Sequence, residues 1–405
     1  MKLWVRVLIG LIAGILLGIV LGPDAAFVKP IGDIFIRLIK MLMVPLIFLS
    51  LVTGVTSMGD TARMGTIGIK TIAVYLVTTT VAVTLGLVFA TLFKPGVGVD
   101  TAGMSSDVAK PEGTISAVDL FVNIVPINPV EAMADGNVLQ VIFFALLIGV
   151  ALVAMGDKVD GLKRAFDQGA ELMYKVTYWV METAPFGVFA LIAWAVGTKG
   201  AQVIESFGWL TITLYLACLC HILIVSFVFV KGYARLPIKR FFGGIRDAQL
   251  VSFSTATSSG TLPVTLSCMQ ENLGVSRSVS SFVLPIGATM NMDGTAIYMG
   301  IVALFTAQAF GVDLSFGAYL TIILTGTLAS IGAAGIPSAG LILIPVVLAS
   351  VGLPDGIVAL IFPIDRLLDM MRTATNVTGD CVVTTVVAKT ENEIDEDVFR
   401  SPATV

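Results

Sequence analysis

The feature that most constrains this chain is a row of charged and polar side chains inside a long apolar segment near the C-terminus. Their spacing of three or four residues places them on one face of about five helical turns. They are Asp365, Asp369, Arg372, Thr373, Asn376 and Asp380. Apolar residues on both sides make the segment long enough to cross a bilayer of about 30 Å. Because each unpaired charge near the bilayer centre costs about 2.5 to 3.5 kcal/mol, this face must contact protein, water or a ligand.

Composition identifies the chain as a membrane protein. Of its 405 residues, 56% are hydrophobic and 13% are charged, and the mean hydropathy is +0.96. Soluble domains carry about 25% charged residues. The formal net charge of -4 provides no basic surface for nucleic acid. The partner expected from composition is therefore the lipid bilayer.

Apolar runs predict six membrane-spanning helices before residue 231, near residues 7–22, 32–58, 67–93, 138–155, 170–197 and 207–230. The first run follows Lys2 and Arg6 as in a signal peptide, but its length and the lack of a clear cleavage site favour a retained span. With a cytoplasmic N-terminus, most Lys and Arg residues fall in cytoplasmic loops, including the loop 231–246. We therefore predict a multi-pass protein of the plasma (inner) membrane with both termini cytoplasmic.

The cysteines and the single histidine give no sign of a metal centre. Cys218, Cys220, Cys268 and Cys381 all lie in apolar segments, without the spacing of a disulfide framework or a zinc site. They are interpreted as packing residues. His221 has no second histidine with which to share a metal, and it is interpreted as an interior-facing helix residue.

Two further apolar segments, 247–269 and 318–351, are interrupted in the middle by Ser, Thr, Gly and Pro, at residues 254–263 and 331–340. In the second segment each half has about a dozen residues, or about 18 Å of helix, so neither half can cross the membrane. Both segments are therefore predicted to form re-entrant hairpins.

Each hairpin is followed by a long apolar segment with its own polar break, Asn291 to Thr295 after the first and Asn376 to Asp380 after the second. The chain thus contains an internal repeat of hairpin and helix. Irregular backbone at membrane depth persists only where it lines a cavity. Paired interruptions in two halves of a chain therefore indicate the binding site of a transporter.

The polar groups of this repeat suit a hard cation and a small zwitterion with an extra carboxylate. Asp293 and Asp380, beside broken helices, would bind a cation such as sodium through oxygen ligands. Arg372 can bind a carboxylate through two donors, and Asp369 can accept an ammonium group. A second anionic group would meet hydroxyl and backbone N–H donors at the first hairpin, those of Ser258, Ser259 and Gly260.

Two other functions fit parts of the pattern. A serine intramembrane protease would have glycine where this chain has Thr257, and no histidine follows Ser258-Ser259-Gly260 in the sequence. Thr378-Gly379-Asp380 matches an aspartyl protease motif only in part. The chain is therefore not expected to be an enzyme. A channel can also be built from polar groups at helix breaks. Paired hairpins that enclose opposite charges favour an occluding carrier instead.

Three stretches, Ser258–Pro263, Asn291–Thr295 and Asp369–Asp380, resemble the signatures of the glutamate transporter family, the dicarboxylate/amino acid:cation symporters. The resemblance covers nearly the whole chain. It implies an all-α polytopic membrane protein with eight transmembrane helices plus two re-entrant helical hairpins, working as a homotrimer by an elevator mechanism. It also implies a scaffold at 1–64 and 96–200, a transport domain at 65–95 and 201–395, and a cytoplasmic tail at 396–405.

The resemblance further implies roles in binding an acidic amino acid, aspartate or glutamate. Arg372 would bind the side-chain carboxylate, with Thr295 and the second hairpin's tip closing over it. Asp369, helped by Thr373, would bind the amino group, and Asn376 would help to hold the main-chain carboxylate. The implied substrate-binding residues are Ser258, Ser259, Thr295, Ile336, Ala339, Gly340, Asp369, Arg372, Thr373 and Asn376.

Sodium is implied as the coupling ion. One implied site uses Asp380 with carbonyls of Gly287, Asn291 and Asn376, and a second uses carbonyls of Thr289, Ser330, Ile331 and Ala333. A third uses Asp293 and Asn291 with Tyr75, Thr78 and Thr79. Met292, between Asn291 and Asp293, is counted with these cation-binding residues. Taken alone, the threonines of the third site would be interpreted as hydrogen-bonding their own helix backbone. The resemblance reverses that interpretation.

The chain also departs from the family pattern. Family members carry a second arginine at one of two positions, which here hold Ala256 and Met370. Met299 stands where proton-linked vertebrate relatives have a glutamate, and a thioether cannot carry a proton. Sodium coupling is therefore expected, with a proton-coupled acidic amino acid or C4-dicarboxylate symporter as the alternative.

Overall fold

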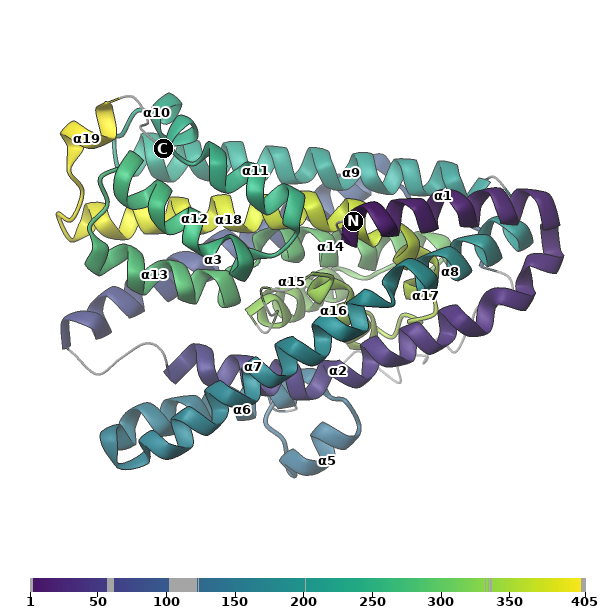
Figure 1. Ribbon diagram of the computed structural model, residues 1–405, viewed down its shortest axis with the longest axis horizontal. Helices are drawn as coiled ribbons and strands as arrows, with labels where there is room; N and C mark the ends of the chain where they lie inside the picture. Colours follow the sequence, from purple (N-terminus) through teal and green to yellow (C-terminus); the bar gives the residue numbers. More distant parts are fainter. Residues whose placement is uncertain are drawn as a thin grey trace.

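The computed structural model describes residues 3–56, 62–101, 122, 124–200, 202–331, 333, 335 and 337–401. Their secondary structure is helical, apart from an isolated bridge between Val275 and Ile394 (Figure 1). The longer helices are α1 (Leu3–Leu21), α2 (Lys29–Thr56), α3 (Ala62–Phe93), α6 (Val138–Met155), α7 (Asp160–Glu182), α8 (Ala184–Lys199), α9 (Gln202–Val225), α11 (Arg246–Thr255), α12 (Ser258–Ser267), α13 (Arg277–Met290), α14 (Asp293–Ala309), α15 (Phe316–Ile331), α16 (Ala339–Ser350) and α18 (Asp365–Thr390). The shorter ones are η1 (Gly22–Val28), α5 (Pro129–Ala134), η2 (Gly156–Val159), η3 (Ser226–Tyr233), α10 (Ile238–Gly244), η4 (Cys268–Asn272), α17 (Ile357–Ile361), η5 (Phe362–Ile364) and α19 (Glu396–Arg400).

One group of helices comes from the first half of the chain. Helix α1 packs along α8, and α2 packs against α6, α7 and α8 (Figure 1). Small residues bring α1 and α8 together: a Cβ atom added at Gly18 would lie 2.8 Å from the carbonyl oxygen of Ala193. Glycines at this kind of contact let helix backbones approach closely in a membrane protein.

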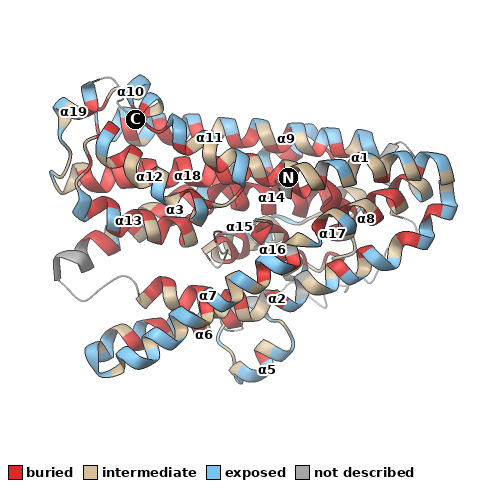
Figure 2. Ribbon diagram, viewed as in Figure 1, coloured by how far each residue is buried: buried red, intermediate tan, exposed pale blue. Residues whose placement is uncertain are grey.

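The second group surrounds α14 and α18, which form its centre. Helix α14 packs against α3, α9, α15, α16 and α18, and α18 packs against α9, α11 and α13. Residues 293–307 of α14 are all buried, as are nearly all residues of α18 from Asp365 to Ala388 (Figure 2). The polar row of α18 therefore faces protein, as the cost of unpaired charge in a bilayer requires.

Both interrupted segments form two short helices that pack against each other, as the sequence predicts. In the first, α11 ends where Ala256 takes a left-handed conformation with φ of 51°. Thr257 then starts α12, because its hydroxyl accepts a hydrogen bond from the backbone N–H of Gly260 at 3.1 Å. In the second, Ser338, also left-handed with φ of 61°, directly precedes α16.

The span expected over 170–197 is wrong as a single helix, because the chain is interrupted at Thr183 between α7 and α8. Pro185 explains the interruption: proline lacks an N–H group and cannot complete the helical hydrogen bonds of the preceding turn. Four helical stretches are by length and composition able to cross a membrane, at Val5–Leu38, Ile67–Phe93, Gln140–Val180 and Ile204–Tyr233. The other described apolar helices are shorter, and the count of eight spans stays a prediction.

Candidate functional site

Arg372 lies at the centre of the polar row and is fully buried. Its Nη2 atom lies 2.8 Å from Oδ1 of Asp369 and 2.9 Å from Oδ1 of Asp365. Asp369, three residues earlier, shares a helix face with Arg372 and is one of its two ion-pair partners. Asp365 as a second partner was not predicted, although its position one further turn along the same face was visible in the sequence.

Two nitrogen atoms of Arg372, Nε and Nη1, are buried without a hydrogen-bond partner in the described part of the chain. The Nη1 atom lies beside the second hairpin: a Cβ atom added at Gly340 would lie 3.1 Å from Nη1 and 2.9 Å from Cγ2 of Thr295. A buried guanidinium with two unused donors is a binding group for a planar anion such as a carboxylate. The structure thus brings Arg372, Thr295 and Gly340 together as predicted.

Asp369 links Arg372 to the tip of the second hairpin. Its Oδ1 atom accepts from Arg372, and its Oδ2 atom accepts a hydrogen bond from the backbone N–H of Ser338 at 2.8 Å. The adjoining Ala339 is buried. Ile336, also predicted at this tip, lies outside the described residues. The carboxylate of Asp369 therefore contacts both Arg372 and the tip of the second hairpin.

The two hairpins meet at their tips. The carbonyl oxygen of Gly335 accepts from the backbone N–H of Ser259 at 3.1 Å and from the hydroxyl of Thr257 at 2.7 Å. Ser258, the first residue of α12, is buried next to this contact. The first turn of α12 is a place where backbone N–H groups favour an anion. The predicted Ser258 and Ser259 thus lie at the junction of the two hairpins.

Asn376 contacts the non-helical segment between α13 and α14. Its side-chain oxygen accepts from the backbone N–H of Gly294 at 2.8 Å, and its side-chain nitrogen lies 3.1 Å from the sulfur of Met292. Thr373, one turn earlier on α18, is buried. In this structure Asn376 therefore fixes the irregular backbone, and its predicted contact with a substrate carboxylate stays a prediction.

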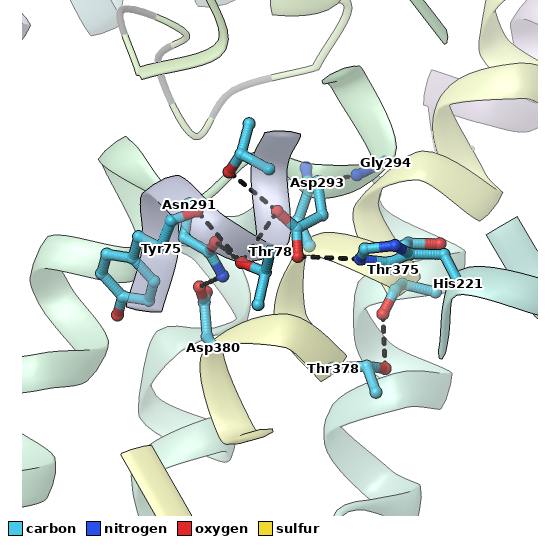
Figure 3. Close-up of polar contacts among 12 residues, drawn as sticks. Tyr75, Thr78, His221, Asn291, Asp293, Gly294, Thr375, Thr378 and Asp380 are labelled. Atoms are coloured by element: carbon cyan, nitrogen blue, oxygen red, sulfur yellow. Dashed lines mark hydrogen bonds and ion pairs between the residues drawn. The ribbon is translucent and has the colours of Figure 1, made fainter. Parts of the chain in front are cut away.

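The groups predicted to bind one cation converge around Asp293 (Figure 3). Its Oδ1 atom accepts from the hydroxyl of Thr79 at 2.9 Å and from that of Thr78 at 3.3 Å. The side-chain oxygen of Asn291 lies 3.4 Å from the Thr78 hydroxyl. The alternative in which these threonines bond only to their own helix is incomplete. Thr78 lies 3.1 Å from the carbonyl oxygen of Tyr75 within α3, but both threonines also contact Asp293.

Asp380 lies next to this cluster and is linked to it by Asn291. The side-chain nitrogen of Asn291 donates to Oδ1 of Asp380 at 2.9 Å. A Cβ atom added at Gly287 would lie 2.5 Å from both this Oδ1 atom and the hydroxyl oxygen of Tyr75. The lack of a side chain at Gly287 is therefore what lets α13, α3 and α18 meet here. The two predicted carboxylate sites are neighbours that share Asn291.

The remaining predicted cation group lies on α13 and at the end of α15. Thr289 donates its hydroxyl to Ile286 at 3.0 Å, and Ser330 donates to Thr327 at 2.8 Å. The carbonyl of Ser330 accepts from the N–H of Ala333 at 3.2 Å. These are contacts within each segment. A cation site formed by Thr289, Ser330, Ile331 and Ala333 stays a prediction.

The donor set around Asp293 and Asp380 suits sodium better than a transition metal. Among the described residues, no group of three or more His, Cys, Asp and Glu side chains is placed to hold a metal ion. The available ligands are carboxylate, amide, hydroxyl and backbone carbonyl oxygens. Hard cations prefer oxygen, whereas zinc, copper and iron prefer imidazole and thiolate.

Sequence reasoning missed three side chains at the site. His221 is buried, as interpreted, but its Nε2 atom also lies 3.0 Å from Oδ2 of Asp293. The ring of Tyr298 lies against Arg372. Arg366 donates through Nη2 to the carbonyl of Thr255 at 2.9 Å, at the end of α11. Arg366 follows Asp365 in the sequence but is not in the polar row, and nothing in the sequence paired it with the first hairpin.

The comparisons with known proteins agree with this geometry. Residues 3–390 match the sodium:dicarboxylate symporter family. The chain is 36% identical to the proton/sodium-glutamate symport protein of Bacillus caldotenax, over 97% of this chain and 95% of that protein. It is also 36% identical to the proton/glutamate-aspartate symporter of Escherichia coli, over 96% and 93% of the two chains.

The chain is as similar to a dicarboxylate transporter as it is to these two glutamate transporters. The C4-dicarboxylate transport protein of Rhizobium johnstonii is 36% identical, over 97% of this chain and 90% of that protein. The aligned region includes the two hairpins. It also includes α14 and α18, the helices that carry the buried arginine and the carboxylates described above. The chain therefore belongs to the sodium:dicarboxylate symporter family, and it is a membrane transporter rather than an enzyme.

Proposed function

We propose that this protein takes up the acidic amino acids aspartate and glutamate, coupled to sodium. The observation that carries the proposal is the fully buried guanidinium of Arg372, with Nε and Nη1 unpartnered among the described residues and Nη1 next to Gly340 of the second hairpin. A substrate side-chain carboxylate beside the hairpin would accept from Nη1. A neutral amino acid would leave this donor unpaired, at a cost of about 1 to 3 kcal/mol or more for a charged group.

Charge favours an amino acid over a C4-dicarboxylate. Asp365 and Asp369 together outweigh Arg372 by one negative charge, and Arg366 on the same helix restores neutrality. An acidic amino acid adds one net negative charge and brings an ammonium group for Asp369. A C4-dicarboxylate adds two negative charges and has no cation to place there. Buried charge without a partner is strongly unfavourable, so the amino acid fits better.

Sodium is the proposed coupling ion because the oxygens of Asp293, Thr78, Thr79 and Asn291 lie together, and Asp380 lies next to them. Binding of monovalent cations would neutralise carboxylates that are otherwise buried. Met299, at the position where proton-linked vertebrate relatives carry glutamate, is buried and cannot take up a proton. The names of the bacterial relatives keep proton coupling and C4-dicarboxylate transport as the alternatives to be tested.

We also propose that transport uses an elevator movement in a homotrimer. The support is the division of the packing: α1, α2, α6, α7 and α8 pack mainly with one another, whereas α3, α9, α14, α18 and both hairpins pack around the binding residues. The proposed moving unit comprises residues 65–95 and 201–395. A unit that carries substrate and cations together needs such an internally continuous core.

The proposal is tested with purified protein in liposomes. Uptake of labelled aspartate, glutamate and succinate is measured under an imposed sodium gradient, an imposed proton gradient, or both. We expect aspartate and glutamate uptake that requires sodium, with little succinate uptake. Full aspartate uptake on a proton gradient without sodium would overturn sodium coupling, and succinate uptake equal to that of aspartate would overturn the substrate assignment.

A further inference from the structure

The two oxygens of Asp293 have different surroundings (Figure 3). Oδ1 accepts from Thr78 and Thr79 on α3, on the side where the proposed cation ligands gather. Oδ2 lies 3.0 Å from Nε2 of His221 on α9. Both His221 and Asp293 are buried, at 1% and 0% exposure. A single carboxylate is therefore fixed from two helices at once.

The contacts of His221 determine which nitrogen carries its hydrogen. An ionised carboxylate only accepts hydrogen bonds, so Nε2 must donate. The other nitrogen, Nδ1, is buried and has no hydrogen-bond partner among the described residues. The arrangement fits an imidazole whose Nε2–H group donates to Asp293.

The surroundings of the pair restrict other positions of Asp293. A Cβ atom added at Gly379 of α18 would lie 2.9 Å from Oδ2 of Asp293, so α18 closes one side. Helix α9 is tied to α18 independently of the pair, because the hydroxyl of Tyr215 donates to the carbonyl of Leu367 at 2.9 Å. The donor of His221 is thus held at a fixed place relative to the proposed cation site.

We propose that His221 is a positioning residue for sodium binding at Asp293. Its Nε2–H group holds Oδ2 and thereby keeps Oδ1 directed toward Thr78, Thr79 and Asn291. Outer partners that orient a ligand in this way commonly change metal affinity about 10- to 100-fold when they are removed. The inference rests on the proposed sodium coupling and adds a residue to it.

The test compares variants of His221 whose side chains place a hydrogen-bond donor at different distances from Asp293. In His221→Gln the amide nitrogen can take the place of Nε2, whereas in His221→Asn the same amide is one methylene shorter. His221→Leu removes the donor. Tyr215→Phe is the matched control, because it removes a hydrogen bond between α9 and α18 without touching Asp293. The rise in thermal midpoint is measured against NaCl concentration without substrate, with choline chloride holding ionic strength constant.

We expect the sodium concentration for half-maximal stabilisation to rise about tenfold in His221→Asn and His221→Leu, and to stay within about threefold of the parent in His221→Gln and Tyr215→Phe. Aspartate uptake at saturating sodium should keep its maximal rate in His221→Asn. If His221→Leu does not fold, the comparison of Gln with Asn remains decisive. Equal sodium responses in these two variants would overturn the inference, as would a tenfold shift in Tyr215→Phe. A parent protein that does not respond to sodium would instead overturn the proposed function.

Discussion

The guanidinium carbon of Arg372 lies 4.1 Å from the ring centroid of Tyr298. The ring covers the guanidinium while Asp365 and Asp369 hold its Nη2 atom. A buried cation against an aromatic ring gains about 2 kcal/mol or more. Arg372 is therefore fixed from its own helix and from α14, and Nη1 next to Gly340 has no hydrogen-bond partner among the described residues. This arrangement prepares the arginine for an anion before one binds.

Replacement of Arg372 by Cys should change the substrate class. Without the guanidinium, aspartate loses its side-chain partner, and its affinity should fall about 100-fold, as expected for a charged hydrogen-bonding pair. Small neutral amino acids such as serine and alanine should then be accepted, because no buried charge is left unpaired. Competition with labelled substrate in liposomes measures both effects. Unchanged aspartate uptake in a folded, sodium-responsive Arg372→Cys protein would show that Arg372 is only a structural partner of Asp369.

Replacement of Arg366 by Met should loosen the first hairpin. The guanidinium donates to carbonyls of Ser254 and Thr255 just before the left-handed Ala256, and a charged hydrogen bond contributes about 1.5 to 3 kcal/mol. Amide hydrogen exchange in residues 257–260 should therefore become at least several-fold faster. The control is Arg400→Met, which removes an exposed ion pair with Glu396. Equal exchange at the hairpin in parent and Arg366→Met would contradict this role.

A Trp at Ala339 should hold the tip of the second hairpin away from the binding site. Ala339 is buried beside Gly340, where a single added Cβ would already lie 2.9 Å from Thr295. Overpacking of such a site costs about 1 to 3 kcal/mol, which the tip can relieve by moving outward. Uptake should fall more than tenfold while sodium still raises the thermal midpoint. The exposed Ala349 on the same helix provides the control substitution Ala349→Trp, and normal transport by Ala339→Trp would indicate a static tip.

Glu396 gives a prediction for pH. Hydrogen bonds from Lys389 and Arg400 hold the pKa of Glu396 below its ordinary value of 4.5. A carboxylate with a lowered pKa in the folded state stabilises the protein at pH values above 4.5, and this contribution is lost as the pH falls through the folded-state pKa. The thermal midpoint of Glu396→Gln should be below that of the parent at pH 7, and the difference should shrink in acid. A difference that grows below pH 4.5 would contradict the assignment.

Contacts along one helix could be predicted from the sequence. The spacing of Asp369 and Arg372 on a helix makes them neighbours, because residues three or four apart share a face. The short apolar stretch on each side of a polar break predicted both hairpins. Each segment does form two short helices in contact, whereas their re-entry into the membrane stays a prediction. The row of polar residues inside an apolar segment also required a protected environment, and the burial of α18 provides it.

Only the tertiary structure decided which faces of different helices meet. His221 and Asp293 are 72 residues apart, and Arg366 and Thr255 are 111 residues apart. No periodicity within a segment links such pairs, since their distance depends on how α9, α11, α14 and α18 cross and rotate against one another. Glycines such as Gly287 and Gly379 set how closely these helices approach. The sequence by itself therefore determined the helices and the polar face of α18, whereas packing determined the partner of each buried charge, because partners from separate helices are chosen by three-dimensional contact.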